Sequence, residues 1–505
     1  MTGLEIGLQV TATGAAAYLL KHYIARIHSS LDDKALALLK SKRVRTFARR
    51  LANRFSAIAA ENRSIVIVGE GELAVEMGIS FRRIGCRVIF VTSDGRHAVD
   101  FVLGDSENHF KRYQEVSISK ETWSISKVAD YSFSTLHGPL WNIIEKNRPA
   151  AVVLEDFFIS KQHWELVELG PARGGDLYRP PFFPSSSVRD GASAASSDLL
   201  SRRETRKFLE GTAGVQLVEC LRLSGKTPSR SFGRFVAKHV SGVFVKPDTT
   251  SSGHGMSYIT EESRIQSALA AMTEKYRVRS KGFLVEEALD LKAVEAMVVV
   301  LTHPNGVMRT VGPIEYKRAV RTETYIGGPF RLAYSRFPAS SINKRIRGEL
   351  CDTAKKIARE FRSPFLAVEF ILADRGAVVN EVSWRPDDIG MVTVLSHHAS
   401  QFDLFANALL GKEWELEDAN SYAESCVCKP IVLAESWWKH PSLAPHSFDS
   451  STAVRLYQKE FLAPHSGVEK VMGFYVTKGK EPKRVEDELS AETQDFRSPG
   501  PLVFY

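Results

Sequence analysis

Apolar runs and helix-like spacing alternate in the first ordered part of the chain. Residues 64–69 (SIVIVG) form a β-branched apolar run, which is typical of a buried strand. A polar turn, Gly69-Glu70-Gly71-Glu72-Leu73, follows, and apolar residues then recur at helical spacing at Met77, Ile79, Phe81 and Ile84. Further strands are predicted at Cys86–Thr92 and Ala150–Leu154. Strand, helix and strand in succession predict a parallel, doubly wound α/β sheet.

Changes in composition divide the chain into segments. Residues 169–197 are rich in Gly, Pro and Ser and predict a loop or insertion. Order resumes at Asp198, the predicted N-cap of a helix through Glu210. The last ninety or so residues hold short strands and many prolines. We therefore predict a basic helical extension (1–60), a Rossmann-like domain with an insertion (61–197), a central α/β domain (198–412) and a small β-rich domain with a tail (413–505).

A predicted hairpin at residues 365–383 carries two carboxylates. Two apolar runs flank the turn tripeptide Asp374-Arg375-Gly376, so the hairpin is centred on Arg375 and places Glu369 opposite Glu381. Opposed residues project to one face, where the two acids repel each other unless a divalent cation lies between them. Mg²⁺ suits such a pair, since it takes one or two protein carboxylates plus phosphate and water. The alternative is an exposed edge with two solvated glutamates, but the polar residues 385–390 that follow favour a site.

A second candidate lies at residues 243–255 (VFVKPDTTSSGHG). A short strand, Val243–Val245, ends at Lys246, and a small-residue loop follows, whose backbone N–H groups and hydroxyls suit phosphate oxygens. A plain surface loop is the alternative, because the loop is not a Walker A motif. A strand at Phe283–Glu287 ends in acids, and Glu295 follows in the next apolar run. A nucleotide base and ribose could bind there, although ordinary strand-end acids would give the same pattern.

Composition narrows the class of protein. The 505 residues are 44% hydrophobic and 25% charged, as in a globular protein of several domains. A net charge of +8 favours anionic partners. No nucleic-acid motif is found, so we expect nucleotide and phosphate ligands rather than nucleic acid. Five scattered cysteines predict reduced thiols in the cytoplasm or another intracellular compartment.

The N-terminal residues are open to two interpretations. Residues 15–28 and 41–54 combine helical apolar spacing with basic faces, as in an organelle-targeting peptide or an interfacial helix. The alternative is a helical extension packed on the main body. No apolar run approaches the roughly 20 residues of a membrane span, so stable membrane insertion is not expected.

Taken together, these motifs resemble the ATP-grasp superfamily, in particular formate-dependent phosphoribosylglycinamide formyltransferase and its purine-pathway relatives. The resemblance runs from about residue 64 to about residue 478. It is carried by GEGEL (69–73), VKPDTTSSGHG (245–255), VEF (368–370) and EVSWRPDDIGMVT (381–393). It implies an ATP-grasp fold preceded by a parallel-sheet domain, and a homodimer acting on a small-molecule carboxylate and amine.

The resemblance also implies roles for individual residues. The ATP phosphates would be held by Arg203, Lys246 and the loop Thr250, Ser251, Ser252, Gly253, His254 and Gly255. Adenine would contact Glu286, Glu287, Ala288 and Leu289, and the ribose Glu295. Mg²⁺ would bind Glu369 and Glu381. The amine pocket would contain Glu72, Leu73, Glu155, Asp388, Lys459 and Lys470. Arg385 would lie near the reacting carboxylate and act in catalysis with Lys246.

Several positions depart from the family pattern. His254 stands where the family usually has Lys, and the spacing from Glu286 to Glu295 is one residue longer. The family's paired-arginine phosphate clamp is replaced by Glu469-Lys470-Val471. We therefore predict an ATP- and Mg²⁺-dependent carboxylate–amine ligase with a diverged amine pocket. The alternatives are a true formyltransferase of purine synthesis, a non-catalytic ATP-grasp module, and a nucleotide-dependent oxidoreductase suggested by Gly69-x-Gly71-x-x-Ala74.

Overall fold

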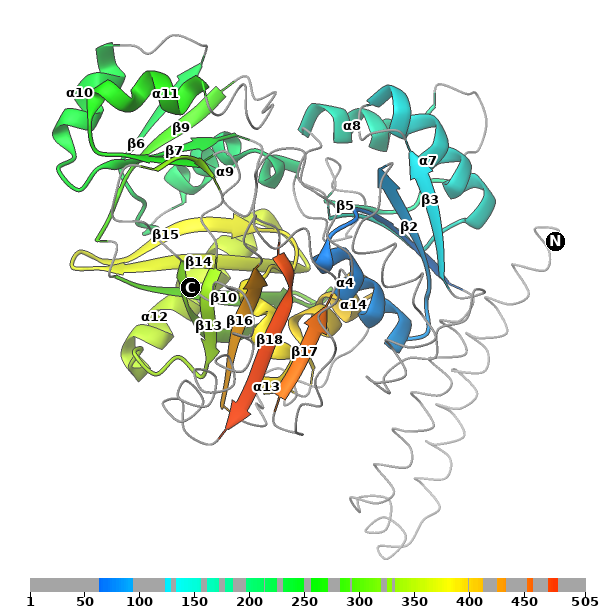
Figure 1. The fold of residues 1–505 in the computed structure, drawn as a ribbon. Helices are drawn as coiled ribbons and strands as arrows, with labels where there is room; N and C mark the ends of the chain where they lie inside the picture. Colours follow the sequence, from blue (N-terminus) through cyan, green and yellow to red (C-terminus); the bar gives the residue numbers. More distant parts are fainter. Residues whose placement is uncertain are drawn as a thin grey trace, which may run out of the picture. The chain divides into compact units, whose positions relative to one another are not determined.

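Three β-sheets organise the described part of the chain (Figure 1). The computed structural model describes residues 63–93, 123–128, 133–155, 161–171, 178–184, 197–212, 214–224, 230–248, 256–270, 282–290, 293–318, 325–328, 332–397, 399–411, 425–432, 452–456 and 471–479. The chain divides into two units, Met1–Glu61 and Asn62–Tyr505. The predicted extension at 1–60 lies outside the described residues, which begin at residue 63. None of the helices described combines the length and hydropathy needed to cross a bilayer.

The first sheet is parallel throughout, as predicted, with strand order β3-β2-β1-β4-β5. Its strands are β1 (Ser64–Val68), β2 (Arg87–Ser93), β3 (Trp123–Val128), β4 (Ala151–Leu154) and β5 (Phe182–Phe183). Its helices are α4 (Glu72–Arg83), α7 (Phe133–Asn147) and α8 (Lys161–Leu169). Strand β3 was not predicted, because it lies at the sheet edge and its sequence, WSISKV, lacks the continuous apolar run of a central strand.

The second sheet is antiparallel and has the order β15-β14-β10-β11-β13-β16-β18-β17. Its strands are β10 (Val294–Thr302), β11 (Met308–Arg318), β13 (Leu332–Phe337), β14 (Phe365–Ala373), β15 (Gly376–Ser383), β16 (Ser425–Val432), β17 (Thr452–Leu456) and β18 (Val471–Gly479). The apolar runs of β10 and β14 are buried, and α12 (Lys344–Phe361) packs on these strands and β11. The strands beyond residue 413 continue this sheet.

The third sheet has the order β12-β8-β7-β9-β6 and a core of its own. Its strands are β6 (Cys220–Ser224), β7 (Val243–Pro247), β8 (Met256–Ile259), β9 (Gly282–Glu287) and β12 (Tyr325–Gly328). Phe232 and Phe235 of α10 (Arg230–Lys238) and Ile265 of α11 (Ile265–Ala270) pack against Val243, Val245 and Val285. Because β7 ends at Pro247, Lys246 lies within this strand, one residue before its end.

Helix α9 (Arg202–Gly211) follows a 3-10 turn, η1 (Ser197–Leu200). The predicted N-cap at Asp198 is wrong: Ser201 caps the helix, its hydroxyl accepting from the backbone N–H of Glu204. Ser201 in turn donates to Asp248, just beyond β7. The sequence shows several residues able to cap this helix, and the contact with Asp248 favours Ser201.

Helix α14 (Gln401–Leu409) joins the first sheet to the second. The Phe405 ring lies 6.2 Å from Phe81 of α4, 5.4 Å from Phe183 of β5 and 5.3 Å from Phe365 of β14, measured between centroids. Arg83 of α4 also pairs with Asp403 at 3.1 Å. Side chains from the parallel sheet and from the hairpin are thereby brought to one region.

Candidate nucleotide and metal site

The hairpin places Glu369 directly opposite Glu381, as predicted. The turn is shorter than predicted, however, since Ala373 pairs with Gly376 and the centre falls between Asp374 and Arg375. A bulge beside Phe370, which pairs with Val379, leaves Asn380 without a partner across the strands and restores the Glu369–Glu381 pairing. Because a bulge adds one residue to one strand, both Asn380 and Glu381 can serve the site.

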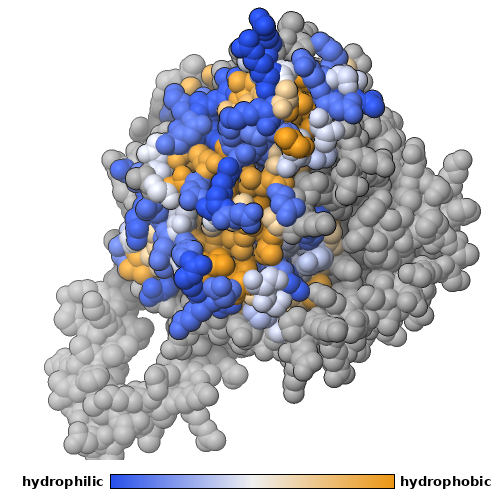
Figure 2. All heavy atoms as spheres, turned by 90° about the vertical axis from the view of Figure 1, so that its left-hand side faces the viewer, coloured by the Kyte–Doolittle hydropathy of each residue, from blue (hydrophilic) through white to orange (hydrophobic). Residues whose placement is uncertain are grey.

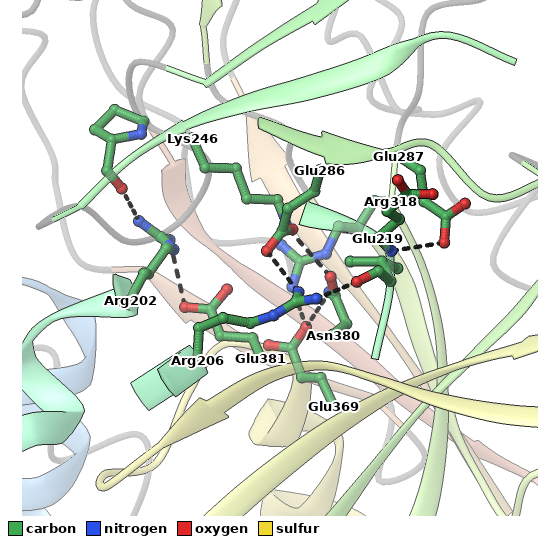
Figure 3. A network of polar contacts seen from close by, with 12 residues as sticks. Arg202, Arg206, Glu219, Lys246, Glu286, Glu287, Arg318, Glu369, Asn380 and Glu381 are labelled. Atoms are coloured by element: carbon green, nitrogen blue, oxygen red, sulfur yellow. Dashed lines mark hydrogen bonds and ion pairs between the residues drawn. The ribbon is translucent and has the colours of Figure 1, made fainter. Parts of the chain in front are cut away.

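Cationic side chains lie beside the two glutamates (Figure 3). Glu369 is 6% exposed, and its Oε2 accepts from the Tyr316 hydroxyl at 2.7 Å and from Arg318 at 2.6 Å. Glu381 pairs with Arg202 of α9 at 3.3 Å. Burial works to raise the pKa of Glu381, but Arg202, Arg318 and Lys246 outweigh it and lower that pKa. Glu381 is therefore an anion, and the pair fits a divalent cation.

Lys246 reaches from β7 toward the hairpin (Figure 3). Its Nζ lies 2.6 Å from Glu286 Oε2 of β9 and donates to Asn380 Oδ1 at 3.2 Å. Arg206 of α9 also contacts Glu286, at 3.3 Å. The buried Glu286 thus has two cationic partners, Lys246 and Arg206, which compensate its charge.

A pocket between the third sheet and the hairpin suits a nucleotide. It has about 750 Å³ of empty space, part of it open solvent. Phe244, Met256, Leu289 and Ile371 line it with apolar surface, and Lys246, Glu286, Glu287, Glu295 and Arg318 add charged groups. Figure 2 shows hydrophobic residues gathered along the middle of one face of the molecule, with hydrophilic residues around them. Apolar walls with a few charged groups are typical of nucleotide pockets.

Most residues predicted to contact adenine and ribose line this pocket. Ala288 is buried instead and packs against Tyr258. Arg203, predicted to hold phosphate, lies against Gly282 of β9. Its neighbours Arg202 and Arg206 make the contacts with Glu381 and Glu286. The spacing of these two arginines, one helical turn apart, could have indicated their shared face once the helix start was known.

A second group of acids surrounds Arg385. Burial, with the charges of Glu155 and Asp388, raises the pKa of Glu72 to about 7. Burial also raises the pKa of Glu155, against the opposing effect of Arg385, and the pKa of Asp388. Leu73 of α4 is buried beside Glu72. The predicted amine-pocket residues of the parallel sheet and of the segment after the hairpin therefore lie within electrostatic range of one another.

The close approach of the backbone to Glu155 explains why the turn after β1 has glycine at position 69. A Cβ on Gly69 would lie 2.4 Å from Oε2 of Glu155 and 2.7 Å from its Cβ. Only glycine therefore lets the turn after β1 lie against Glu155, which follows β4. The adjacent acid Glu70 accepts from Ser93 at the end of β2. The carboxyl ends of three parallel strands thus meet at one edge.

Some predicted residues lie outside the described part of the chain: Thr250 through Gly255, Lys459 and Lys470. The motifs also gave no indication of Tyr316, Arg318 and Asn380. Tyr316 and Arg318 come from β11, a strand with no motif of its own, and β-pairing through β10 brings them to Glu369. Their alternation along β11 was the only signal, because residues two apart share a face.

Comparison with known proteins defines the class. Residues 226–402 match the ATP-grasp domain family. They include Lys246, Glu286, Glu295 and both hairpin glutamates. The chain therefore carries an ATP-grasp domain within an α/β ATP-grasp fold. This match disfavours the oxidoreductase alternative.

The chain is similar to curated formate-dependent phosphoribosylglycinamide formyltransferases. It is 23% identical to that of Synechococcus sp. (strain CC9311) over 383 residues, covering 75% of this chain and 83% of the relative. It is 23% identical to that of Ignicoccus hospitalis, covering 84% and 93%.

Solved structures share the fold at low identity. Carboxyaminoimidazole ribonucleotide synthase from Aspergillus clavatus, complexed with ATP, has a TM-score of 0.62 at 14% identity, covering 86% of this chain and 98% of its own. Biotin carboxylase from Campylobacter jejuni also gives 0.62 at 14% identity, covering 85% and 90%. The comparisons confirm the predicted ATP-grasp fold, and the proteins that they name are enzymes.

Proposed function

We propose that the protein is an ATP- and Mg²⁺-dependent carboxylate–amine ligase that works through an acyl phosphate. The observation that carries the proposal is the Glu369–Glu381 pair beside Lys246, at the edge of a pocket suited to a nucleotide. In the first step a carboxylate oxygen bonds to the γ-phosphorus of ATP as the bond to the bridging oxygen breaks, giving ADP. The amine nitrogen then bonds to the acyl carbon, phosphate leaves, and a base accepts the amine proton.

In this reaction the protein's own residues position the reactants and neutralise the charge of the phosphate groups. Glu369 and Glu381 would hold Mg²⁺, which when bound offsets the charge of the phosphate oxygens. Lys246 supplies a charge to the phosphate chain, and Arg318 and Arg202 hold the glutamates in place. Arg385 faces the reacting carboxylate. No covalent nucleophile of the protein is required.

The acids near Arg385 suit an amine. An ammonium group is attracted by Glu72, Glu155 and Asp388, and it must lose a proton before its nitrogen can attack. With a pKa of about 7, Glu72 is matched to accept that proton at neutral pH. Glu469, in the sequence where a paired-arginine clamp is expected, would oppose a phosphate dianion. We therefore propose an amine substrate without a phosphate group, outside purine synthesis.

A formate-dependent phosphoribosylglycinamide formyltransferase is the second candidate, and the names of the curated relatives favour it. The deciding experiment supplies the purified protein with ATP, Mg²⁺, formate and glycinamide ribonucleotide. Formylation at micromolar glycinamide ribonucleotide would establish the purine assignment and refute the diverged amine pocket. Absence of ADP release across a broad panel of carboxylates and amines would instead favour a non-catalytic ATP-grasp module.

A further inference from the structure

A second pocket lies beside the nucleotide pocket, on the side of α9. It contains about 810 Å³ of empty space, part of it open solvent. Lys246, Glu286, Asn380 and Glu381 line both pockets, so the two meet at the hairpin. The nucleotide pocket already contains most of the residues assigned to adenine and ribose, which leaves this second space for another reactant.

Apolar side chains form a substantial share of the second pocket's lining. Its apolar lining includes Leu199, Leu200, Leu209, Leu217, Val382 and Trp384. Most of these side chains are at least nine-tenths buried, and Leu217 is half-buried. The polar lining residues are Thr205, Asn380 and Ser383, which are uncharged, and Arg202, Arg206, Lys246, Asp248, Glu286, Glu381 and Arg385, which are charged. An apolar tail that lies against the apolar residues would be removed from water.

One end of the same pocket is built for an anion. Arg385 lines it, is 4% exposed, and has a buried Nε with no hydrogen-bond partner among the described residues. Its Nη1 donates to the carbonyl of Pro386, at 2.9 Å. A buried donor without a partner is costly, and a guanidinium matches a carboxylate with two parallel bonds. Arg202 and Lys246 also line this pocket.

From this arrangement we propose that the carboxylate substrate is a monocarboxylic acid with a compact apolar tail, larger than formate. The carboxylate binds Arg385 and faces the γ-phosphate, and the tail lies against the leucines of η1 and α9. A second carboxylate on the tail is disfavoured, because Glu286 and Glu381 line the same space. The inference rests on the proposed ligase function and names its substrate class.

The test uses hydroxylamine, which attacks an acyl phosphate and gives a hydroxamate without the natural amine. The full-length protein is incubated with ATP, Mg²⁺, hydroxylamine and one acid from the series formate, acetate, butyrate and hexanoate. We expect kcat/KM to rise about fourfold for each methylene that becomes buried, until the pocket is filled. Hydroxamate formed from formate as efficiently as from hexanoate would overturn the inference and leave the ligase proposal intact.

Calorimetry distinguishes a failure of the substrate inference from a failure of the proposed ligase function. Hexanoate is titrated into the protein with ADP and Mg²⁺. Binding of hexanoate without ADP release in the assay would support the pocket's occupant while refuting the ligase. If hexanoate shows neither binding nor turnover, the inference is overturned.

Variants of the wall test the location. Leu209→Phe, on α9, should lower the ratio of hexanoate to formate kcat/KM at least about tenfold, because the added ring occupies the tail space. Leu166→Phe, on the exposed surface of α8, is the matched control and should keep the wild-type ratio. Leu217→Phe, at a half-buried position, replaces Leu209→Phe if circular dichroism shows that the latter does not fold. An unchanged ratio in a folded wall variant would refute the placement.

Discussion

At the scale of single residues, the site depends on charge compensation. Each hairpin glutamate is held by an arginine from another element: Glu369 by Arg318 of β11 and Glu381 by Arg202 of α9. Burial acts to raise the pKa of Glu381, and Arg202, Arg318 and Lys246 lower it. The same arrangement implies that a bound cation must share both glutamates with the arginines.

Replacing Glu381 with Gln should lower the rate of ATP turnover at least about 100-fold, because an amide oxygen is a weaker ligand for Mg²⁺ than a carboxylate. ADP release at saturating ATP and Mg²⁺ measures the effect, and circular dichroism checks the fold. Glu349→Gln, on the exposed face of α12, is the matched control and should retain wild-type activity. Full activity in Glu381→Gln would exclude a role for this residue in metal binding.

Glu72 gives a pH-dependent prediction. Its pKa is about 7 in the native state against 4.5 in the unfolded chain, so the native state keeps a proton that the unfolded state releases. The contribution to stability is present below pH 4.5 and is lost as the pH rises through 7. Because one pKa unit corresponds to about 1.4 kcal/mol, the ionised side chain costs the native state about 3 kcal/mol.

Glu72→Gln should remove this pH dependence. The variant should match the wild type near pH 4 and gain up to about 3 kcal/mol relative to it at pH 8. Urea unfolding at pH 4, 6 and 8 gives the difference in free energy. A difference that does not change with pH would show that the Glu72 pKa is not raised in the native protein.

At the scale of elements, the hairpin illustrates both the reach and the limit of sequence patterns. Its two strands and its opposed glutamates follow from alternating apolar residues around a turn. The register was predicted from a centre at Arg375, whereas the turn is centred half a residue earlier and the bulge at Asn380 compensates. A bulge cannot be recognised reliably in a single sequence, because the inserted residue need not differ in type from its neighbours in the strand.

The turn after β1 gives a prediction for an element. Gly69→Ala should destabilise the protein by about 1–3 kcal/mol, since the new methyl overlaps the Glu155 side chain and must displace β4 or the turn. It should also raise the KM for the amine, because Glu155 moves. Gly348→Ala, in α12, is the control: nothing lies within 4 Å of the position that its methyl group would occupy, so a neutral or stabilising effect is expected. Thermal unfolding and steady-state kinetics compare the two, and equal effects would contradict the close contact.

At the scale of the molecule, local signals gave the fold, and long-range contacts built the site. The parallel sheet, the hairpin and the strand of Lys246 each carry a local apolar pattern. Arg202, Arg318 and Tyr316 do not, because their role arises only when α9 and β11 approach the hairpin. The pocket of leucines beside Lys246 is likewise a product of packing between η1, α9 and β15. No periodicity in any one segment indicates such a pocket.

Division of the chain at residue 61 makes a prediction for the whole protein. Residues Asn62–Tyr505 form one unit that contains all three sheets and every described residue of the proposed site. A truncated protein that lacks residues 1–61 should therefore fold and release ADP at a rate within about twofold of the full-length protein, because no step of the proposed chemistry uses the missing segment. Size-exclusion chromatography and circular dichroism establish that the truncated protein is folded before the assay. Loss of ADP release in a folded, soluble truncation would show that residues 1–61 contribute to the site or to an assembly that completes it.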